Sequence, residues 1–363
     1  MGKKVKIGNI EIGGGSPIAI QSMTNTPTSD FDTTFSQLLA LQNAGCDIAR
    51  MAVNNADDIN SSKRLIKSIS MPLVADIQFD YRLAVASADA GFAKIRFNPG
   101  NIGNEKNVLE VVSACKANNV PIRIGVNSGS LEKDIANEFG YGAKALYESA
   151  VKNVKLLEKY GFYHIVISAK SSNVKTTVDT YRLLSALDYP LHLGVTESGY
   201  STMGTIKSSI GIGALLLDGI GDTIRVSLTG DPIEEIEVAN NILKSLGLKS
   251  NYCEIVSCPT CSRCHYDMES IIKELTDYTK NIKKKIKIAG MGCIVNGPGE
   301  AREADFGFAG GANGQAIIFE KGKVVKKIST DEIIKEIKWR IDKFWHLFYF
   351  KNLMKLQMEN LTI

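Results

Sequence analysis

The sequence has no apolar run long enough to cross a membrane, since a spanning helix needs about 20 consecutive apolar residues. Residues 1–12 contain lysines but no apolar segment typical of a secretory signal, so we expect a cytoplasmic protein. The net charge is only +4, which is too small to predict binding to nucleic acid or to an anionic membrane surface. Low-complexity segments are also absent. What remains is a chain of 363 residues, 44% of them hydrophobic, which is typical of a globular protein with two domains.

Cysteines are few but unevenly placed. Cys46 and Cys115 lie in helix-like stretches and are interpreted as small core residues. The other five lie after residue 250, at positions 253, 258, 261, 264 and 293. Because cytosolic thiols are normally reduced, this group predicts metal binding rather than disulfides.

Short apolar and β-branched segments alternate with helix-like segments from residue 16 to about residue 246, as in parallel α/β folds. The predicted strands are Ile18–Met23, Ile48–Val53, Leu73–Ile77, Lys94–Asn98, Ile122–Asn127, His164–Ala169, Leu191–Glu197 and Thr223–Leu228. The clearest helices are Asp32–Ala44, Tyr81–Ala90, Tyr141–Lys159 and Ile233–Leu246. Eight such units favour an α/β fold with an N-terminal (β/α)8 TIM-like barrel, and a doubly wound open sheet is the alternative.

The predicted strands end in unusually polar residues, and TIM barrels carry their chemistry at these ends. Alternate residues of a strand share a face. Arg96 therefore projects to the same side as Asn98, and the same holds for Arg123 with Asn127 and for Arg225 with Ser227. The residues concerned are Arg50, Asp76, Arg96, Asn98, Arg123, Asn127, Lys170, Glu197, Arg225 and Ser227. Four arginines and a lysine meeting at one mouth predict a multiply charged anion, and a diphosphate fits them better than a single phosphate. The alternative is that some arginines form structural ion pairs with Asp76 or Glu197, two carboxylates that could also move protons.

A break at residues 247–251 separates the predicted barrel, residues 1–247, from a smaller α+β domain, residues 252–343. The smaller domain should contain a helix near Asp267–Lys280, a strand at Lys285–Ala289, and a hairpin at Ala316–Ile328. A further helix is expected from about Asp331. The composition of the aromatic-rich tail, residues 344–363, does not indicate its role.

The smaller domain contains Cys258-Pro-Thr-Cys261, then Cys264, and after a gap Cys293 and a glycine-rich segment that leads to Glu300. A C-x2-C pair suits both zinc and iron–sulfur sites. Cys293 has no nearby partner cysteine or histidine, as a zinc ribbon would have, and glycine-rich backbone can approach a bulky inorganic core. These features favour a cluster. Three cysteines with a carboxylate would leave one iron open to substrate, whereas four cysteines would make an electron relay. Cys264 is interpreted as a bystander.

Specific motifs occur in order from about residue 3 to residue 340. They are QSMTNT, PLVADI, KIRFNPGNIG, PIRIGVNSGSLE, LHLGVTESG, GIGALLLDGIGDTIRVSLTGDP, SCPTC and GCIVNGPGE. With them the sequence resembles the 4-hydroxy-3-methylbut-2-enyl diphosphate synthases of the methylerythritol phosphate pathway to isoprenoids, in their shorter bacterial form.

The resemblance implies reductive ring opening of 2-C-methyl-D-erythritol 2,4-cyclodiphosphate to 4-hydroxy-3-methylbut-2-enyl diphosphate, with loss of water. It implies a [4Fe–4S] cluster held by Cys258, Cys261, Cys293 and Glu300, with electrons from reduced flavodoxin or ferredoxin. The eight residues that match the family's diphosphate-binding positions are Arg50, Arg96, Asn98, Arg123, Asn127, Lys170, Arg225 and Ser227. Asp76, Glu197 and Glu300 are the expected catalytic residues. Departures from the family pattern are Gln78, where a histidine is usual, Cys264, and the tail after about Asp342, which has no counterpart in the family.

The resemblance also implies a head-to-tail homodimer, and chain length supports it. The break of five residues spans at most about 17 Å, less than the height of a barrel. This connecting segment begins at the end of the last barrel helix, which lies at the face of the barrel opposite the polar strand ends. A cluster domain therefore reaches the mouth of a partner's barrel more easily than its own.

The alternative function belongs to a different class of protein. It is a zinc-stabilised barrel that binds a phosphorylated ligand without redox chemistry.

Overall fold

The computed structural model describes residues 2–280, 282–294, 299, 301–311 and 313–344. Glu300, one of the predicted cluster ligands, and residues 345–363 of the predicted tail lie outside the described residues. The chain divides between Leu248 and Lys249 into two compact units.

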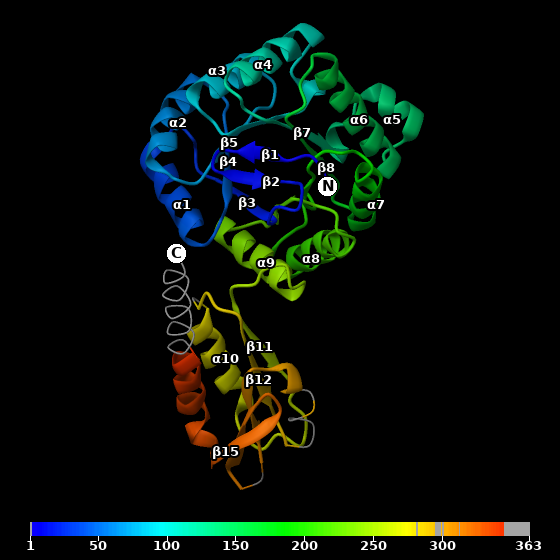
Figure 1. Cartoon of the computed structure of the whole chain (residues 1–363). Coiled ribbons are helices and arrows are strands. Elements are labelled where there is room, and N and C mark those ends of the chain that lie inside the picture. The colour runs from blue at the N-terminus through cyan, green and yellow to red at the C-terminus, as the bar shows by residue number, and fades with distance from the viewer. Residues whose placement is uncertain (1, 281, 295–298, 300, 312, 345–363) are drawn as a thin grey trace, which may run out of the picture. The chain divides into compact units, whose positions relative to one another are not determined.

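The first unit is a parallel barrel surrounded by helices (Figure 1). Its eight-stranded sheet has the order β8-β7-β6-β5-β4-β3-β10-β9, and a parallel bridge between Ile167 and Leu191 joins the two ends. The strands are β3 (Ala19–Met23), β4 (Ile48–Ala52), β5 (Leu73–Asp76), β6 (Lys94–Phe97), β7 (Ile122–Asn127), β8 (Ile165–Lys170), β9 (His192–Leu193) and β10 (Thr223–Ile224). The predicted (β/α)8 barrel is therefore confirmed, and the open doubly wound sheet is wrong.

The helices of this unit are α1 (Phe31–Asn43), α2 (Ala56–Ser68), α3 (Tyr81–Ala90), α4 (Glu105–Ala117), α5 (Lys133–Phe139), α6 (Ala143–Lys159), α7 (Val174–Leu184), α8 (Ser201–Leu217) and α9 (Pro232–Ser245). Helix α3 has the predicted bounds because local signals set both of its ends. Asp80 caps the first turn by accepting from the backbone N–H of Arg82, and Gly91 ends the helix with φ of 95°.

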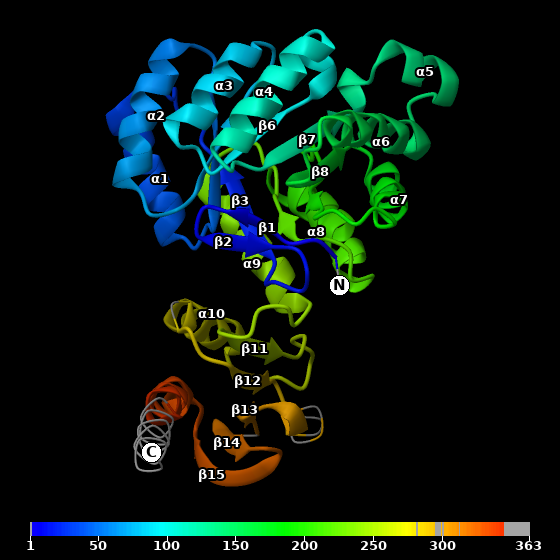
Figure 2. The same ribbon diagram turned by 45° about the horizontal axis from the view of Figure 1, so that its top comes forward.

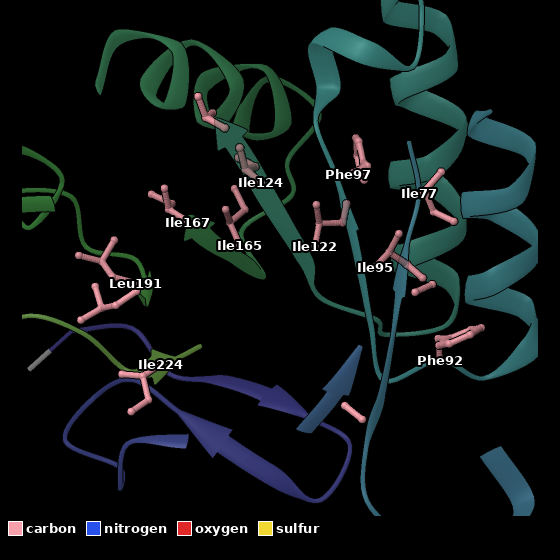
Figure 3. Close-up of a cluster of buried hydrophobic side chains, with 14 of the residues drawn as sticks. Ile77, Phe92, Ile95, Phe97, Ile122, Ile124, Ile165, Ile167, Leu191 and Ile224 are labelled. Carbon is pink, nitrogen blue, oxygen red and sulfur yellow. The ribbon is translucent and has the colours of Figure 1, made fainter. Parts of the chain in front are cut away.

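Alternation along the strands separates the apolar core from the barrel interior. Ile95 and Phe97 on β6 and Ile122 and Ile124 on β7 belong to the buried apolar cluster between strands and helices (Figure 3). Because successive side chains point to opposite faces of a strand, the arginines between these residues face the inside of the barrel. The alternation that directs the apolar side chains toward the helices thus directs the cationic side chains into the barrel.

The last two barrel strands are shorter than predicted. Regular pairing covers only His192–Leu193 and Thr223–Ile224, whereas the sequence predicted strands to Glu197 and Leu228. Beyond these residues the pairing is irregular: the backbone N–H of Arg225 still donates to the carbonyl of Leu193 at 3.0 Å, whereas that of Leu228 donates to the Glu235 side chain at 3.1 Å.

A hairpin that the sequence pattern did not reveal covers the other end of the barrel. It consists of β1 (Val5–Ile7) and β2 (Ile10–Ile12), and Figure 1 shows it across the end of the strands. Val5, Ile7 and Ile12 pack on apolar residues at the N-terminal ends of the barrel strands. The C-terminal ends of the strands, where the polar residues gather, therefore form the open mouth.

The second unit is a mixed five-stranded sheet with helices on one face (Figure 2). The strands follow chain order: β11 (Cys253–Ser257), β12 (Ile286–Met291), β13 (Phe306–Gly310), β14 (Gln315–Glu320) and β15 (Lys323–Ser329). Helix α10 (Met268–Thr279) and a helix at 333–344 pack their apolar residues on this sheet. The predicted α+β fold of this part is confirmed.

Candidate active site

A cavity of about 190 Å³ lies inside the barrel at the C-terminal ends of its strands. Its lining residues come from almost every strand around the mouth. They are Arg50, Asp76, Gln78, Arg96, Arg123, Asn127, Ser168, Lys170, Thr196, Arg225 and Ser227. The structure thus brings together all five predicted cations, and among the described residues that line the cavity Asp76 is the only carboxylate. This composition suits an anion that carries several charges.

Asp76 holds two of the arginines. Its Oδ1 accepts from Arg96 Nη1 at 2.9 Å, and its Oδ2 lies 3.8 Å from Arg50 Nε. Gln78 Nε2 donates to the same carboxylate at 3.3 Å. Burial raises the pKa of Asp76, but the charges of Arg50 and Arg96 outweigh it and leave that pKa below its ordinary value. The predicted ion pairs at Asp76 are present, and they orient two arginines at the cavity wall.

Arg225 and Arg123 have different anchors, which the sequence did not indicate. Arg225 Nη2 lies 3.5 Å from Oε1 of Glu235, a buried residue of α9. Glu235 Oε2 also accepts from the hydroxyl of Ser22 at 2.8 Å. Arg123 Nη1 is 3.0 Å from Nε2 of His192. Each arginine of the cavity wall therefore has a fixed partner behind it.

Two glycines inside the barrel make room for the cationic side chains. A Cβ atom at Gly125 would lie 2.3 Å from Arg96 Nε, and one at Gly194 would lie 2.7 Å from Lys170 Nζ. Carbon atoms normally approach no closer than about 3.5 Å, so neither position accepts a side chain without displacing a cation. The glycines in the sequence motifs around β7 and β9 thus set the shape of the cavity.

Two predicted site residues are not on the cavity wall. Asn98 is buried, but its side chain turns back to accept from the backbone N–H of Gly100 at 3.1 Å. Glu197 is exposed, next to the lining residue Thr196, and has φ of 51°. Left-handed backbone is unfavourable for a residue with a side chain and often marks functional loops. Asn127 does line the cavity, and in the amide orientation that satisfies both ends its oxygen accepts from Arg96 Nη2 at 3.2 Å.

The cavity is short of negative charge. Burial lowers the pKa of Arg50 to about 9, and it lowers the pKa of Lys170 and Arg123 well below the ordinary values. Neighbouring cations act in the same direction, Arg225 on Lys170 and Arg50 on Arg123. Among the described residues, the buried Nε–H groups of Arg96, Arg123 and Arg225 have no acceptor. A bound anion would supply both the charge and the acceptors.

The second unit gathers cysteines at one edge of its sheet. Strands β11 and β12 are parallel, with Ser257 opposite Gly290, so Cys258 and Cys293 follow them at the same edge. The backbone N–H of Gly292 donates to Cys258 Sγ at 3.1 Å. A Cβ at Gly292 would lie 3.2 Å from Cys264 Sγ and 3.6 Å from Cys258 Sγ. Glycine at this position therefore lets backbone and thiols approach closely.

Cys261 is exposed in the loop after β11, and hydrogen bonds from the backbone and side chain of Arg263 lower its pKa. A thiol that ionises easily, as Cys261 does, and a backbone N–H directed at a sulfur atom, as at Cys258, fit the donor chemistry of iron–sulfur clusters. Within the part of the chain that the structure describes, no three His, Cys, Asp or Glu side chains already lie close enough to hold one metal ion.

Comparison with known proteins identifies the family. Residues 2–240 match the GcpE TIM-barrel domain, and residues 254–343 match the GcpE protein C-terminal domain.

The chain belongs to the GcpE family.

Curated relatives in the GcpE family match almost the whole chain. A protein of Fusobacterium nucleatum is 53% identical over 93% of this chain and 96% of its own length. Proteins of Caldanaerobacter subterraneus and Clostridium perfringens are 53% and 54% identical, over 94% and 92% of this chain and 96% of their own lengths. All three are named 4-hydroxy-3-methylbut-2-en-1-yl diphosphate synthase (flavodoxin). The resemblance seen in the motifs is confirmed, and the alternative of a zinc-stabilised binding protein receives no support.

The family membership leaves several neighbours of the cavity without an assigned role. His192, Glu235 and the fully buried Lys94 were not among the predicted site residues. His192 is 69 residues from Arg123, whereas Glu235, on α9, is 10 residues from Arg225 and 213 from Ser22. For His192 and Lys94, a buried polar residue inside an apolar strand was the available signal in the sequence. Among the described residues, no helix has the length and apolar composition to cross a membrane.

Proposed function

We propose that this chain catalyses the reductive ring opening of 2-C-methyl-D-erythritol 2,4-cyclodiphosphate to 4-hydroxy-3-methylbut-2-enyl diphosphate. The chain is an oxidoreductase of isoprenoid precursor biosynthesis. The observation that carries the proposal is the cavity wall of five cations and one carboxylate, in a chain about half identical to synthases of this name.

The barrel residues bind and orient the diphosphate. Arg50, Arg96, Arg123, Arg225 and Lys170 supply charge-assisted hydrogen bonds to its oxygens, and Ser227 and Asn127 add neutral ones. Asn98, which directly follows β6 and is buried, is included in the proposed site. Because the four arginines are already anchored, little reorganisation of their side chains accompanies binding. Asp76 keeps its negative charge between two arginines, so its role is to orient them. Glu197, in the loop beside Thr196, is the exposed carboxylate available for proton transfer.

The cysteine edge of the second unit is proposed to hold a [4Fe–4S] cluster through Cys258, Cys261 and Cys293, with Glu300 as the carboxylate ligand. When bound, the cluster would pass the two electrons that the ring opening requires from the reduced donor protein to the substrate, one at a time. The N–H of Gly292 stabilises the charge on Cys258 Sγ. Cys264 remains a bystander in this assignment.

Reduced flavodoxin is the proposed electron donor, because the relatives carry that donor in their names, and ferredoxin is the alternative. A reducing cytoplasm suits both the donor and the free thiols. A head-to-tail homodimer is proposed, in which each cluster domain serves the barrel of the partner subunit. The short connection between α9, which ends at Ser245, and β11, which begins at Cys253, supports it.

The test is an anaerobic assay of the purified full chain after iron and sulfide reconstitution. With reduced flavodoxin and the cyclic diphosphate, the product should form, and the protein should contain about four irons and four acid-labile sulfides per chain. Zinc without sulfide, or a cluster without turnover of this substrate, would refute the proposal.

Arg123→Leu tests the cavity separately. One charge-assisted hydrogen bond contributes about 1.5–3 kcal/mol, so the substrate should bind at least about tenfold more weakly, with an unchanged cluster spectrum. Arg182→Leu is the matched control, because Arg182 is half exposed and pairs with Asp218 on the outside of the barrel. Equal affinity in the two variants would remove Arg123 from the site.

A further inference from the structure

Arg123 differs from the other arginines of the cavity in the chemistry of its anchor. The other three lie beside carboxylates, either Asp76 or Glu235. Among the described residues, no carboxylate forms a salt bridge with Arg123, and its Nη1 instead lies 3.0 Å from His192 Nε2. Both side chains are buried, Arg123 with 1% and His192 with 0% of its surface exposed. The contact is therefore shielded from solvent.

The direction of this hydrogen bond determines the state of the imidazole. A guanidinium can only donate, so His192 Nε2 must accept and cannot carry a proton. The ring is therefore neutral, with its hydrogen on Nδ1. Burial, followed by the nearby charges of Arg123 and Lys170, lowers the pKa of His192 well below its ordinary value, in agreement with a neutral ring.

The backbone of His192 is fixed by neighbouring elements. Its carbonyl accepts from the hydroxyl of Tyr181 on α7, and the same hydroxyl accepts from the backbone N–H of Ala169 on β8 at 3.2 Å. On the other side, His192 pairs with Thr223 of β10. The imidazole is thus attached to a rigid part of the barrel, directly behind an arginine of the cavity wall.

We propose that His192 is a positioning residue for Arg123, which it holds at the cavity as a neutral acceptor so that the guanidinium keeps its full charge for the diphosphate. A carboxylate in the same place would fix the arginine equally well but would cancel part of that charge and repel the phosphate oxygens. This inference depends on the proposed diphosphate site and adds a residue to it.

A double-mutant cycle tests the proposal. Binding of 2-C-methyl-D-erythritol 2,4-cyclodiphosphate to the unreduced, cluster-loaded full chain is measured by calorimetry, so that no turnover occurs. His192→Leu removes the acceptor and should weaken binding about tenfold. In the Arg123→Leu background, the same substitution should have no further effect, because the arginine that it positions is absent. Melting temperatures of all four proteins are recorded alongside.

Two more variants keep the test decisive if the leucine substitution prevents folding. His192→Gln retains an acceptor of similar reach and should bind within about threefold of wild type, whereas His192→Asn is polar but too short and should bind about tenfold more weakly. Equal affinity in the Gln and Asn variants, or a full additional loss in the Arg123→Leu background, would overturn the positioning role. Wild-type protein that does not bind the cyclic diphosphate would instead overturn the proposed function.

Discussion

Substitution of Gly125 by alanine should disable the cavity without unfolding the barrel. An alanine Cβ would lie 2.3 Å from Arg96 Nε, 2.7 Å from Nη2 and 2.8 Å from Cζ. Since carbon contacts begin near about 3.5 Å, the guanidinium must move by roughly 1 Å or more. The displaced group is the end of a flexible side chain, so the strands keep their pairing. Arg96 would lose its 2.9 Å hydrogen bond to Asp76 and its place in the wall.

The expected loss is that of one charge-assisted hydrogen bond to the diphosphate, about 1.5–3 kcal/mol, or roughly tenfold to a hundredfold in Kd. Calorimetric titration of the unreduced protein with the cyclic diphosphate measures it. Gly129→Ala is the matched control, because Gly129 lies in the turn that follows β7, is exposed, and its Cβ would have no atom within 4 Å. If Gly125→Ala binds as well as Gly129→Ala, the close approach of Arg96 to the backbone does not shape the site, and the reasoning is refuted.

Four further predictions concern other parts of the protein. Cys264→Ser should retain iron, sulfide and activity, and loss of the cluster in this variant would favour ligation by four cysteines. Co-expression of Arg123→Leu with Cys293→Ser should restore activity, to at most about half per heterodimer, because one mixed site is intact; background activity would exclude a site shared between subunits. Gln78→His should change the rate by less than about threefold, since glutamine cannot carry a proton and the reaction therefore does not depend on an imidazole at this place on the cavity wall; a large gain would contradict this. The imidazole of His192 stays neutral in the folded protein below about pH 6.5, whereas in the unfolded chain it takes up a proton there. On acidification below this pH, the free energy of unfolding should therefore fall by up to about 1.4 kcal/mol per pH unit. Melting curves should show a smaller fall in His192→Gln, and equal falls would refute the linkage.

Much of the fold could be predicted because the relevant signals are local. The spacing of apolar residues by three and four positions predicts α3 with its observed bounds. The alternation of side chains along β6 and β7 predicts that Arg96 and Arg123 face the inside of the barrel. The N-terminal hairpin, Val5–Ile12, was missed because its strands have only three residues each. A segment this short is too small to show a period.

The sequence by itself determined which side of each strand carries the cations, since the side-chain period of a strand needs no knowledge of its neighbours. It also determined the cysteine spacing and the family motifs. Only the tertiary structure decided how the arginines are held, because their partners lie on other elements of the barrel: His192 is 69 residues from Arg123, Asp76 is 20 residues from Arg96, and Glu235 reaches Arg225 from the last barrel helix. Closure of the barrel brings these groups within hydrogen-bonding distance, and no local pattern encodes a contact of that kind.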